Sequence, residues 1–441
     1  MVIVITFTAI GCSDTIETVT LPPGSRKDSV ELFRKAFASP EECRSCHPDH
    51  FREWEQSMHA YAMKDPILFA LDSVGQVRSA GRLGQFCVEC HSPTAVSIDN
   101  IAHSGERTKL SGISAHGISC DVCHRLAPNQ STTSNSLKFI LDSTRLGPIK
   151  DPLPNAYHRS EYDSRFEDNS EICRPCHDFR TPNNFPIERT FTEWKNSTFP
   201  GRLISCQTCH MKFYTGKAAT NGPERERVHH HTMVGVDVPL TEFPGRDETI
   251  AEIAAMLTYS VQMDVIAPKT VQSQDSSISM QVVIQNILTG HNIPSGAIFE
   301  RQMWLEIIAQ DEKGDTLFAS GMLDKNGDLL DYHSNEVRSG RVAEDKSLAL
   351  YNGKAYRHGE ETLFFWEADF VDNRTIPPFE SRMNRFQIPV PKRGGAEVNV
   401  SVRLLFRALP PYLLRMLGHA TLVEKVPIFT METHQQTIIV Q

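Results

Sequence analysis

The stretch CRSCHPDHFREWEQSMHA, residues 43–60, contains the pattern that decides the fold. Its first five residues read C-x-x-C-H, and the same pattern recurs four more times before residue 211. All of the 11 cysteines except Cys12 lie in these pairs, and every second cysteine is followed directly by histidine. The pairs are Cys43/Cys46, Cys87/Cys90, Cys120/Cys123, Cys173/Cys176 and Cys206/Cys209, followed by His47, His91, His124, His177 and His210.

Three ordinary explanations of paired cysteines compete here: a disulfide framework, zinc ribbons or redox-active dithiols. None of them requires histidine directly after the second cysteine. With 18 histidines in 441 residues, chance would place all five with a probability of roughly 10⁻⁷. The pattern therefore predicts five covalently attached c-type haems, with the motif histidines as proximal iron ligands.

The spacing of the motif has a chemical reason. Two intervening residues let both thiols reach the two vinyl groups of one porphyrin, and the next histidine then falls beneath the iron. Only about 34 residues are available for each haem between Cys43 and His210, so the haems themselves should form most of the core. We expect short helices, long ligating loops and closely stacked porphyrins in this part of the chain.

Length and composition exclude other classes of protein. The chain has 441 residues, of which 40% are hydrophobic and 22% charged, so it can form two or three packed domains and is not disordered. Lys and Arg number 45 against 54 Asp and Glu, giving a net charge of −9. A nucleic-acid-binding protein should carry a basic footprint, so this balance argues against one.

Beyond about residue 245 the pattern changes from cysteine motifs to alternating strands. Residues 247–258 predict a short helix with acidic residues in its first turn, and Pro410–Leu417 a second one. Apolar and polar residues alternate over 278–284 and 397–407, which is typical of half-buried strands. Further strands are expected at Met303–Gln310, Thr316–Ser320, Leu363–Phe370, Asn384–Val390 and Thr437–Val440.

The predicted fold class is therefore mixed: a haem-cored domain of short helices and loops, followed by an all-β, sandwich-like domain. The expected boundaries are a signal segment at 1–12, a tether at 13–40, the pentahaem domain at 41–235, a connecting helix and linker at 236–262, and the β-sandwich at 263–441.

The remaining cysteine, Cys12, follows the apolar stretch MVIVITFTAIG. This arrangement is similar to the end of a bacterial lipoprotein signal, in which the cysteine is lipidated, although no basic residues precede it. The alternative is an ordinary secretory signal with an incidental cysteine. Either reading predicts export, since c-type haem is attached outside the cytoplasm, and we expect a periplasmic or outer-membrane lipoprotein held at the membrane by its lipid.

These residues also carry a family resemblance. The stretch 43–60, with C-x-x-C-H followed by W-x-x-S-x-H, resembles the opening of multihaem cytochromes of the cytochrome c-554 type. The segments HGISCDVCH, EICRPCHDFRTP and SCQTCHM look like the body of the same superfamily, which includes electron carriers and some nitrogen-cycle enzymes. Pentahaem nitrite reductases of that superfamily use C-x-x-C-K at the catalytic haem, whereas all five motifs here end in histidine.

Candidates for the sixth, distal iron ligands follow partly from this resemblance. His59 matches the histidine of W-x-x-S-x-H, and His231 matches an H-x-apolar-x-G pattern after the last motif of related cytochromes. His116 stands four residues before Cys120, and His291 lies in a Gly/Pro-rich loop that could reach a haem edge. His229, His230 and His103 are further candidates, whereas His50, His158, His333, His358, His419 and His434 are expected to be solvent-facing or structural.

A weak internal repeat follows the first and fourth motifs. Glu53-Trp54-x-x-Ser57 recurs as Glu193-Trp194-x-x-Ser197, but the position of His59 is taken by Phe199, which cannot bind iron. The corresponding haem must find its sixth ligand elsewhere or remain five-coordinate. Alternatively, Trp194 and Phe199 are simply aromatic residues that pack against haem.

Together these features predict an exported pentahaem electron carrier, rather than an enzyme, that passes single electrons between redox proteins. The acidic balance favours a partner with basic residues around its own haem. Two alternatives remain open. One is a reductase of a small nitrogen or sulfur oxyanion at a five-coordinate haem beside Trp194 and Phe199; the other is a haem-bearing subunit of a larger complex or filament.

Overall fold

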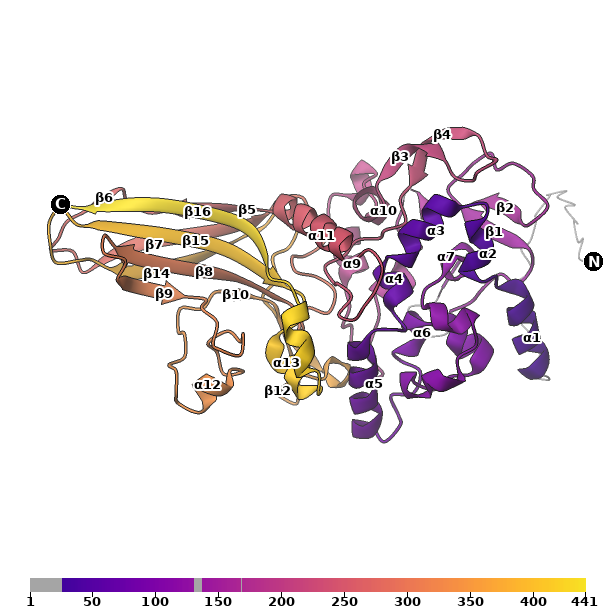
Figure 1. Cartoon of the computed structure of the whole chain (residues 1–441), viewed down its shortest axis with the longest axis horizontal. Coiled ribbons are helices and arrows are strands. Elements are labelled where there is room, and N and C mark those ends of the chain that lie inside the picture. Colours follow the sequence, from indigo (N-terminus) through magenta and orange to yellow (C-terminus); the bar gives the residue numbers. More distant parts are fainter. Residues whose placement is uncertain (1–25, 131–136, 168) are drawn as a thin grey trace, which may run out of the picture.

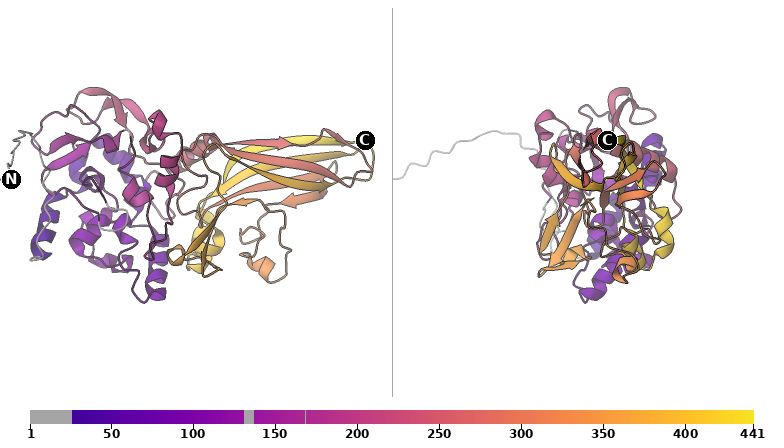
Figure 2. Two further views of the ribbon diagram at one scale, coloured as in Figure 1. Left: turned by 180° about the vertical axis from the view of Figure 1, so that it is seen from behind. Right: turned by 90° about the vertical axis from the view of Figure 1, so that its left-hand side faces the viewer.

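The structure is a computed structural model that describes residues 26–130, 137–167 and 169–441. Cys12, the predicted signal and residues 13–25 of the predicted tether lie outside the described residues, whereas residues 26–36 of that tether form a helix. Two parts with different architecture lie end to end along the long axis, a helix-and-loop part and a strand part, and the views in Figures 1 and 2 agree on this arrangement. No helix among the described residues is long and apolar enough to cross a membrane.

The helix-and-loop part consists of short helices joined by long loops (Figure 1). Side-chain caps fix where some of these helices begin: the Ser57 hydroxyl accepts from the Ala60 amide, and the Asp65 carboxylate accepts from the Ile67 amide. The helices are α1 (Arg26–Ala36), α2 (Pro40–Arg44), α3 (Pro48–Glu55), α4 (Met58–Tyr61), α5 (Pro66–Arg78), α6 (Val88–His91), α7 (Cys120–His124), α8 (Arg174–His177), α9 (Thr190–Asn196) and α10 (Cys206–His210).

Four short strands complete this part. β1 (Thr144–Gly147) pairs in parallel with β2 (Arg159–Tyr162), and β3 (Phe213–Lys217) pairs antiparallel with β4 (Glu224–His229). Each pair is isolated, so neither builds an extended sheet. Their role in the fold is to place the loops on either side of them.

The strand part contains two main sheets. One has the order β10-β8-β15-β16-β6 with β9 beside β8, and the other has the order β14-β7-β5. Its strands are β5 (Val261–Ile266), β6 (Thr270–Val271), β7 (Ser277–Asn286), β8 (Gln302–Asp311), β9 (Thr316–Ser320), β10 (Leu350–Tyr351), β14 (Ser381–Pro389), β15 (Glu397–Arg407) and β16 (Phe429–Val440). A separate small sheet joins β11 (Gly353–Arg357), β12 (Glu360–Thr362) and β13 (Phe370–Asn373).

Alternation along the strands builds the core. Ile278 and Val282 of β7 and Val398 and Val402 of β15 are buried, and they belong to one hydrophobic cluster that both main sheets share. The mixed class predicted from the sequence, short helices followed by strands, is therefore found. One expected strand is wrong: in place of a strand over Leu363–Phe370 the chain forms a 3-10 turn at Phe365–Glu367, because the buried Trp366 anchors it to the core.

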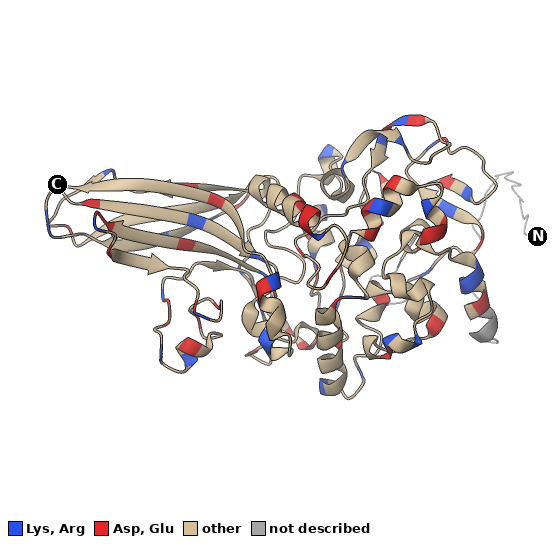
Figure 3. Ribbon diagram, in the orientation of Figure 1, with Lys and Arg blue, Asp and Glu red and all other residues tan. Residues whose placement is uncertain are grey.

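The two parts share a continuous interface. Helix α11 (Arg246–Ser260) connects them, and its Ile253 and Leu257 pack in the core of the strand part. From the other side, Leu71 and Phe86 of the helix-and-loop part join the same cluster. Basic and acidic residues are interspersed along both parts, without a segment of a single sign (Figure 3).

Candidate haem sites

Each C-x-x-C-H segment lies on one tight helical turn. In the second and fourth motifs, for example, the amides of His91 and His177 donate to the carbonyls of Cys87 and Cys173 at 3.2 and 3.0 Å. Residues three and four apart share one face of a helix, so the turn directs both thiols and the imidazole to the same side. All ten cysteines of the motifs are free thiols, none of them in a disulfide.

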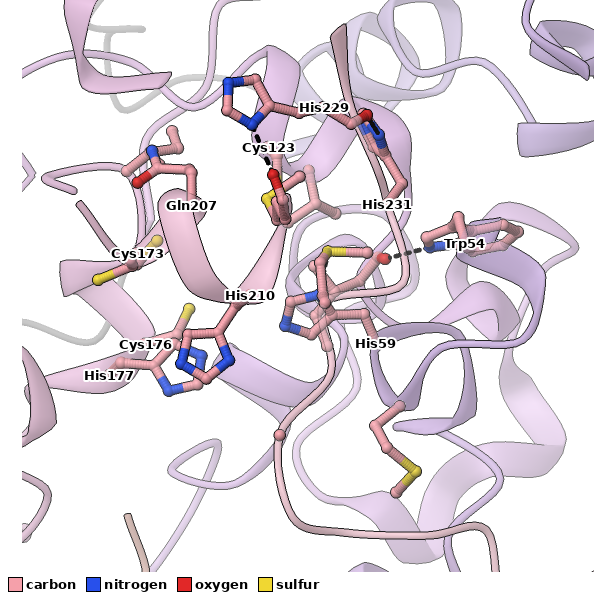
Figure 4. Close-up of a pocket in the computed structure, with 18 of the residues that line it drawn as sticks. Trp54, His59, Cys123, Cys173, Cys176, His177, Gln207, His210, His229 and His231 are labelled. Carbon is pink, nitrogen blue, oxygen red and sulfur yellow. Dashed lines mark hydrogen bonds between the residues drawn. The ribbon is translucent and has the colours of Figure 1, made fainter. Parts of the chain in front are cut away.

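One large cavity receives all of these groups. It has a volume of about 1880 Å³, lies within the helix-and-loop part and reaches the strand part at the loop around His291, and all ten motif cysteines and all five motif histidines line it. Figure 4 shows part of it, with Cys173 and Cys176 beside the rings of His177 and His210. Most of the lining is apolar. Thiols, imidazoles and apolar walls are what covalently attached haem requires, so the residues present fit this cofactor.

Four of the five motif histidines face a second imidazole. A metal bound between two imidazoles holds their ring centroids about 6.3 Å apart, because each metal–nitrogen bond is about 2.0 Å and the nitrogen lies about 1.15 Å from its ring centroid. The four pairs have almost this spacing: His124–His231 at 6.3 Å, His177–His59 at 6.4 Å, His210–His291 at 6.3 Å and His47–His158 at 6.5 Å.

Backbone carbonyls orient these rings. The Nδ1 atoms of His47, His124 and His210 hydrogen-bond to carbonyl oxygens at 2.6, 2.6 and 2.5 Å. On the opposite side, the Nδ1 atoms of His231 and His291 bond to carbonyls at 2.9 and 2.8 Å. A hydrogen bond at Nδ1 fixes the tautomer and leaves Nε2 to bind a metal, which is the usual arrangement of metal-ligating histidines.

Burial also sets the protonation state that iron binding needs. It lowers the pKa of His59, His91 and His177 to about 4, with neighbouring imidazoles acting in the same direction. Burial likewise lowers the pKa of His231 and His291. All of these rings are therefore neutral at pH 7, and the neutral imidazole is the form that binds a metal.

His91 differs from the other motif histidines. Among the described residues no second imidazole faces it at this spacing, whereas each of the other four motif histidines has one. Acidic side chains gather nearby instead: Asp72 and Glu300 act on the adjacent Cys87 thiol, and Asp237 acts on His91 itself. Within the described part of the chain, His91 is therefore the one motif histidine that no other imidazole faces.

The structure corrects several of the expected distal ligands. His116 lies outside the cavity with Nε2 3.5 Å from Glu41, and His103 lies outside it at the start of a 3-10 helix. His230 is turned away, because its Nδ1 bonds to Glu53 at 2.5 Å. His229 lines the cavity but faces no motif histidine, since its ring is held by the Met211 carbonyl (Figure 4).

Two histidines expected to be structural also line the cavity. His158, at the end of a proline-rich loop just before β2, faces His47. His50 lies 6.1 Å from His47 as well, and its ring packs 4.3 Å from that of His231. Because His50 stands only three residues after His47, in the first turn of α3, it cannot reach the opposite side of a haem bound to His47. No motif surrounds His158, so only its place in the folded chain identifies it.

Contacts between motifs link the five sites into one array. The Cys43 thiol lies close enough to Cys120 for the two to affect each other's pKa, and the same holds for Cys173 with Cys206 and for Cys176 with Cys90. Cys123 also lies close enough to Cys173 and Cys176 to act on them electrostatically. The first and third motifs are therefore neighbours, the third adjoins the fourth, and the fourth adjoins both the fifth and the second.

Comparison with known proteins gives one family and one fold. The family model described as cytochrome c554 and c-prime matches residues 42–125, which hold the first three motifs. A penta-heme cytochrome c552 from Thermochromatium tepidum has a similar structure, with a TM-score of 0.61 and 20% sequence identity over 92% of this chain and 100% of that one. No curated protein sequence matches the chain.

Two other solved structures match 41% of this chain. The sporulation control protein Spo0M from Bacillus subtilis has a TM-score of 0.15 at 10% identity and is covered over 49% of its length. The structural-genomics target SoR45 has a TM-score of 0.17 at 9% identity and is covered over 88%. Neither value supports a structural argument.

Proposed function

We propose that this chain, a multihaem c-type cytochrome, binds five haems and carries single electrons through them between redox partners. The observation that carries the proposal is the set of four imidazole pairs, each at the spacing that a bis-histidine iron requires. The family model covers three of the five motifs, and the structurally similar cytochrome c552 is itself described as penta-heme.

The residues that would hold each haem follow from the geometry. The motif cysteines would form the thioethers and the motif histidines the proximal bonds. His158, His231, His59 and His291 would supply the distal bonds opposite His47, His124, His177 and His210, respectively. When bound, haem accepts and releases one electron at its iron, and bis-histidine ligation keeps its potential low.

At four of these sites the chain's own residues favour electron transfer over reaction of a substrate at the iron. Imidazoles would take both axial positions there. Backbone carbonyls orient at least one ring in three of the four pairs, whereas in the fourth the Nδ1 atom of His59 contacts the Met233 sulfur. Thiol contacts such as those of Cys43 with Cys120 and Cys173 with Cys206 bring neighbouring motifs together. Close spacing and closed coordination together suit passage of electrons along the array.

A second function is favoured by His91 alone. Its missing distal partner would leave one coordination position open, and the surrounding acids could supply protons: burial raises the pKa of Glu300 to about 7 and that of Asp65 to about 6. This would suit reduction of a small nitrogen or sulfur oxyanion. The open position then lies at the second motif and not beside Trp194 and Phe199, where the loop carrying His291 packs.

A subunit role in a larger complex or filament predicts that some distal ligand comes from another chain. Four motif histidines already find a partner within this chain, which favours a self-contained carrier.

We also propose that the strand part is a β-sandwich that covers haem edges, docks a partner and provides His291. Support comes from its two main sheets sharing one core.

Export and membrane attachment through Cys12 remain proposals from the sequence. Docking to a basic partner is likewise a proposal, which the net charge of −9 supports. Such docking should weaken as the salt concentration rises. Intact-protein mass spectrometry of the exported chain tests the first: a diacylated Cys12 supports the anchor, and an unmodified cleaved chain contradicts it.

Electron paramagnetic resonance of the ferric holoprotein, after mass spectrometry has counted its haems, tests the function. We expect five haems, four of them low-spin and the one at His91 high-spin. The spectrum is then repeated with nitrite and with hydroxylamine. A high-spin signal that stays unchanged supports the carrier, whereas a shift with either compound supports the reductase. Fewer than five haems would contradict both proposals.

A further inference from the structure

The two Glu-Trp segments of the internal repeat make the same hydrogen bonds. The Trp54 indole donates to the carbonyl of Ile118 at 2.8 Å, and the Trp194 indole donates to the carbonyl of Ile204 at 2.9 Å. Both acceptors stand two residues before the first cysteine of a motif, the third motif for Ile118 and the fifth for Ile204. Each buried tryptophan thus holds the segment that leads into one proximal histidine.

The glutamates of the same segments hold the opposite side of those two sites. Glu53 accepts from the backbone amide of His231 at 2.7 Å. Glu193 accepts from the amide of Asn292, directly after His291, at 3.1 Å and from the Ser295 hydroxyl at 2.7 Å. In both cases the carboxylate fixes the backbone at the histidine that faces the motif held by the neighbouring tryptophan.

We propose that each Glu-Trp pair is a clamp that sets the axial distance of one haem site. The clamp of Glu53 and Trp54 spans His124 and His231, and the clamp of Glu193 and Trp194 spans the equivalent pair of the fifth motif. Adjacent residues in one helix reach the proximal and the distal segment, so the two sides of the site cannot separate independently. The glutamates are positioning residues. This inference rests on the proposed haem ligation.

Burial makes these contacts strong. Glu53 is only 9% exposed, and both Trp54 and Trp194 are 6% exposed. A buried carboxylate that loses its donors is left desolvated without a partner, which is unfavourable for a charged group. The carboxylates therefore favour the conformation in which the distal loops stay in place.

The place of each repeat in the array explains why Phe199 stands where the first repeat has His59. Two residues after Ser57, His59 faces His177 of the next site along the array. Two residues after Ser197, Phe199 packs against Phe379 of the strand part, with ring centroids 5.5 Å apart. The second repeat ends the array against the strand part, so an apolar ring replaces the histidine.

Substitution of the glutamates in the full-length holoprotein tests the clamp. In Glu53→Ala the low-spin signal of the third site should turn high-spin, and in Glu193→Ala that of the fifth, each adding one haem per chain to the high-spin component. Glu53→Gln and Glu193→Gln retain an acceptor oxygen and should restore most of the low-spin signal. Glu306→Ala is the matched control, because Glu306 is equally buried but pairs with Arg403 inside the strand part.

A second variant displaces the same loop without touching a glutamate. A Cβ on Gly290 would lie 3.1 Å from Trp194 and 3.3 Å from Phe199, so Gly290→Val should push His291 away and reproduce the Glu193→Ala spectrum. Gly112→Val is its control, since a Cβ there meets no atom within 4 Å and Gly112 lies outside the cavity.

Unchanged low-spin signals in both alanine variants would overturn the clamp while leaving five haems and the proposed function intact. A wild-type protein without haem at the third and fifth motifs would instead overturn both. Wild-type haem content is therefore measured first, so that the two failures are distinguishable.

Discussion

At the scale of single residues, function depends on which imidazoles reach across the cavity. His59, His231 and His291 each face a motif histidine, as the sequence suggests, whereas His103 and His116 do not line the cavity at all. Distance along the chain does not decide this. What matters is whether the backbone directs Nε2 towards the motif, and carbonyls placed at Nδ1 accomplish that.

His158 provides a prediction at this scale. In His158→Ala the haem of the first motif should lose one axial ligand, so one low-spin signal disappears and one high-spin signal appears. His50→Ala is the matched comparison, because His50 lies at a similar distance from His47 but packs against His231. Paramagnetic resonance of both variants checks this. Loss of the low-spin signal in His50→Ala alone would reverse the assignment.

At the scale of elements, α12 (Asn335–Arg338), α13 (Pro411–Met416) and β12 lie below the long strands of the strand part in Figure 1. The His333 ring stacks on Tyr412 of α13 (Pro411–Met416) at 4.1 Å, with an interplanar angle of 5°. Its two nitrogens lie 3.5 Å from Asp331 and 3.5 Å from Glu361 of β12. One histidine therefore ties the loop before α12 (Asn335–Arg338) to two other elements.

This contact should depend on pH. Burial by itself lowers the pKa of His333, but hydrogen bonds to Asp331 and Glu361 outweigh it and raise the pKa above its usual value of 6.5. Two further groups lie beside Glu361: the Lys354 ammonium at 3.7 Å and the hydroxyl of Tyr332. They do not reverse the rise in the pKa of His333. A raised pKa stabilises the fold fully below pH 6.5, and this stabilisation is lost as pH rises through the folded-state pKa.

Hydrogen exchange of the backbone amides of residues 331–338 measures the effect. Between pH 6 and pH 8, after correction for intrinsic exchange, protection should fall in the wild type and stay level in His333→Phe, which keeps a stacking ring without the charge. His358→Phe is the control, since that imidazole is 81% exposed. Equal loss of protection in wild type and His333→Phe would contradict the prediction.

At the scale of the whole molecule, the two parts have different sources of stability. The strand part has its own hydrophobic cluster across both main sheets, whereas the helix-and-loop part surrounds an apolar cavity of about 1880 Å³. Leaving that volume unfilled would cost about 45 kcal/mol at about 24 cal/mol per Å³. Domains have only about 5–15 kcal/mol of net stability, so we expect the helix-and-loop part to lose this fold when no cofactor fills the cavity.

Limited proteolysis of protein produced without haem attachment checks this difference. We expect rapid digestion up to about α11 and a resistant fragment that starts near Arg246 and extends to the C-terminus. The haem-loaded protein, treated in parallel, should resist over both parts. A haem-free chain that resists proteolysis over residues 41–235 would show that the protein alone fills this core.

The sequence by itself determined the cofactor chemistry and the order of the two parts. Thioether attachment and the proximal bond need two thiols and an imidazole on a single helical turn. The motif is therefore a run of five consecutive residues, such as Cys120–His124, and can be recognised from the sequence. Strand alternation is equally local, and six of the seven strands expected from it are present. The turn at Phe365–Glu367 was not predicted, because burial of Trp366 overrides the β-forming residues around it. The short strands of the helix-and-loop part and β5, β6 and β10 to β13 were not predicted either.

Only the tertiary structure decided the distal side. His158 reaches His47, and His291 reaches His210, from segments whose local pattern is that of ordinary loops. Nothing near His91 in the sequence distinguishes its motif from the other four, yet the fold brings no imidazole opposite it among the described residues. A distal ligand is defined by its position across a cavity, and that position exists only after packing has brought distant segments together.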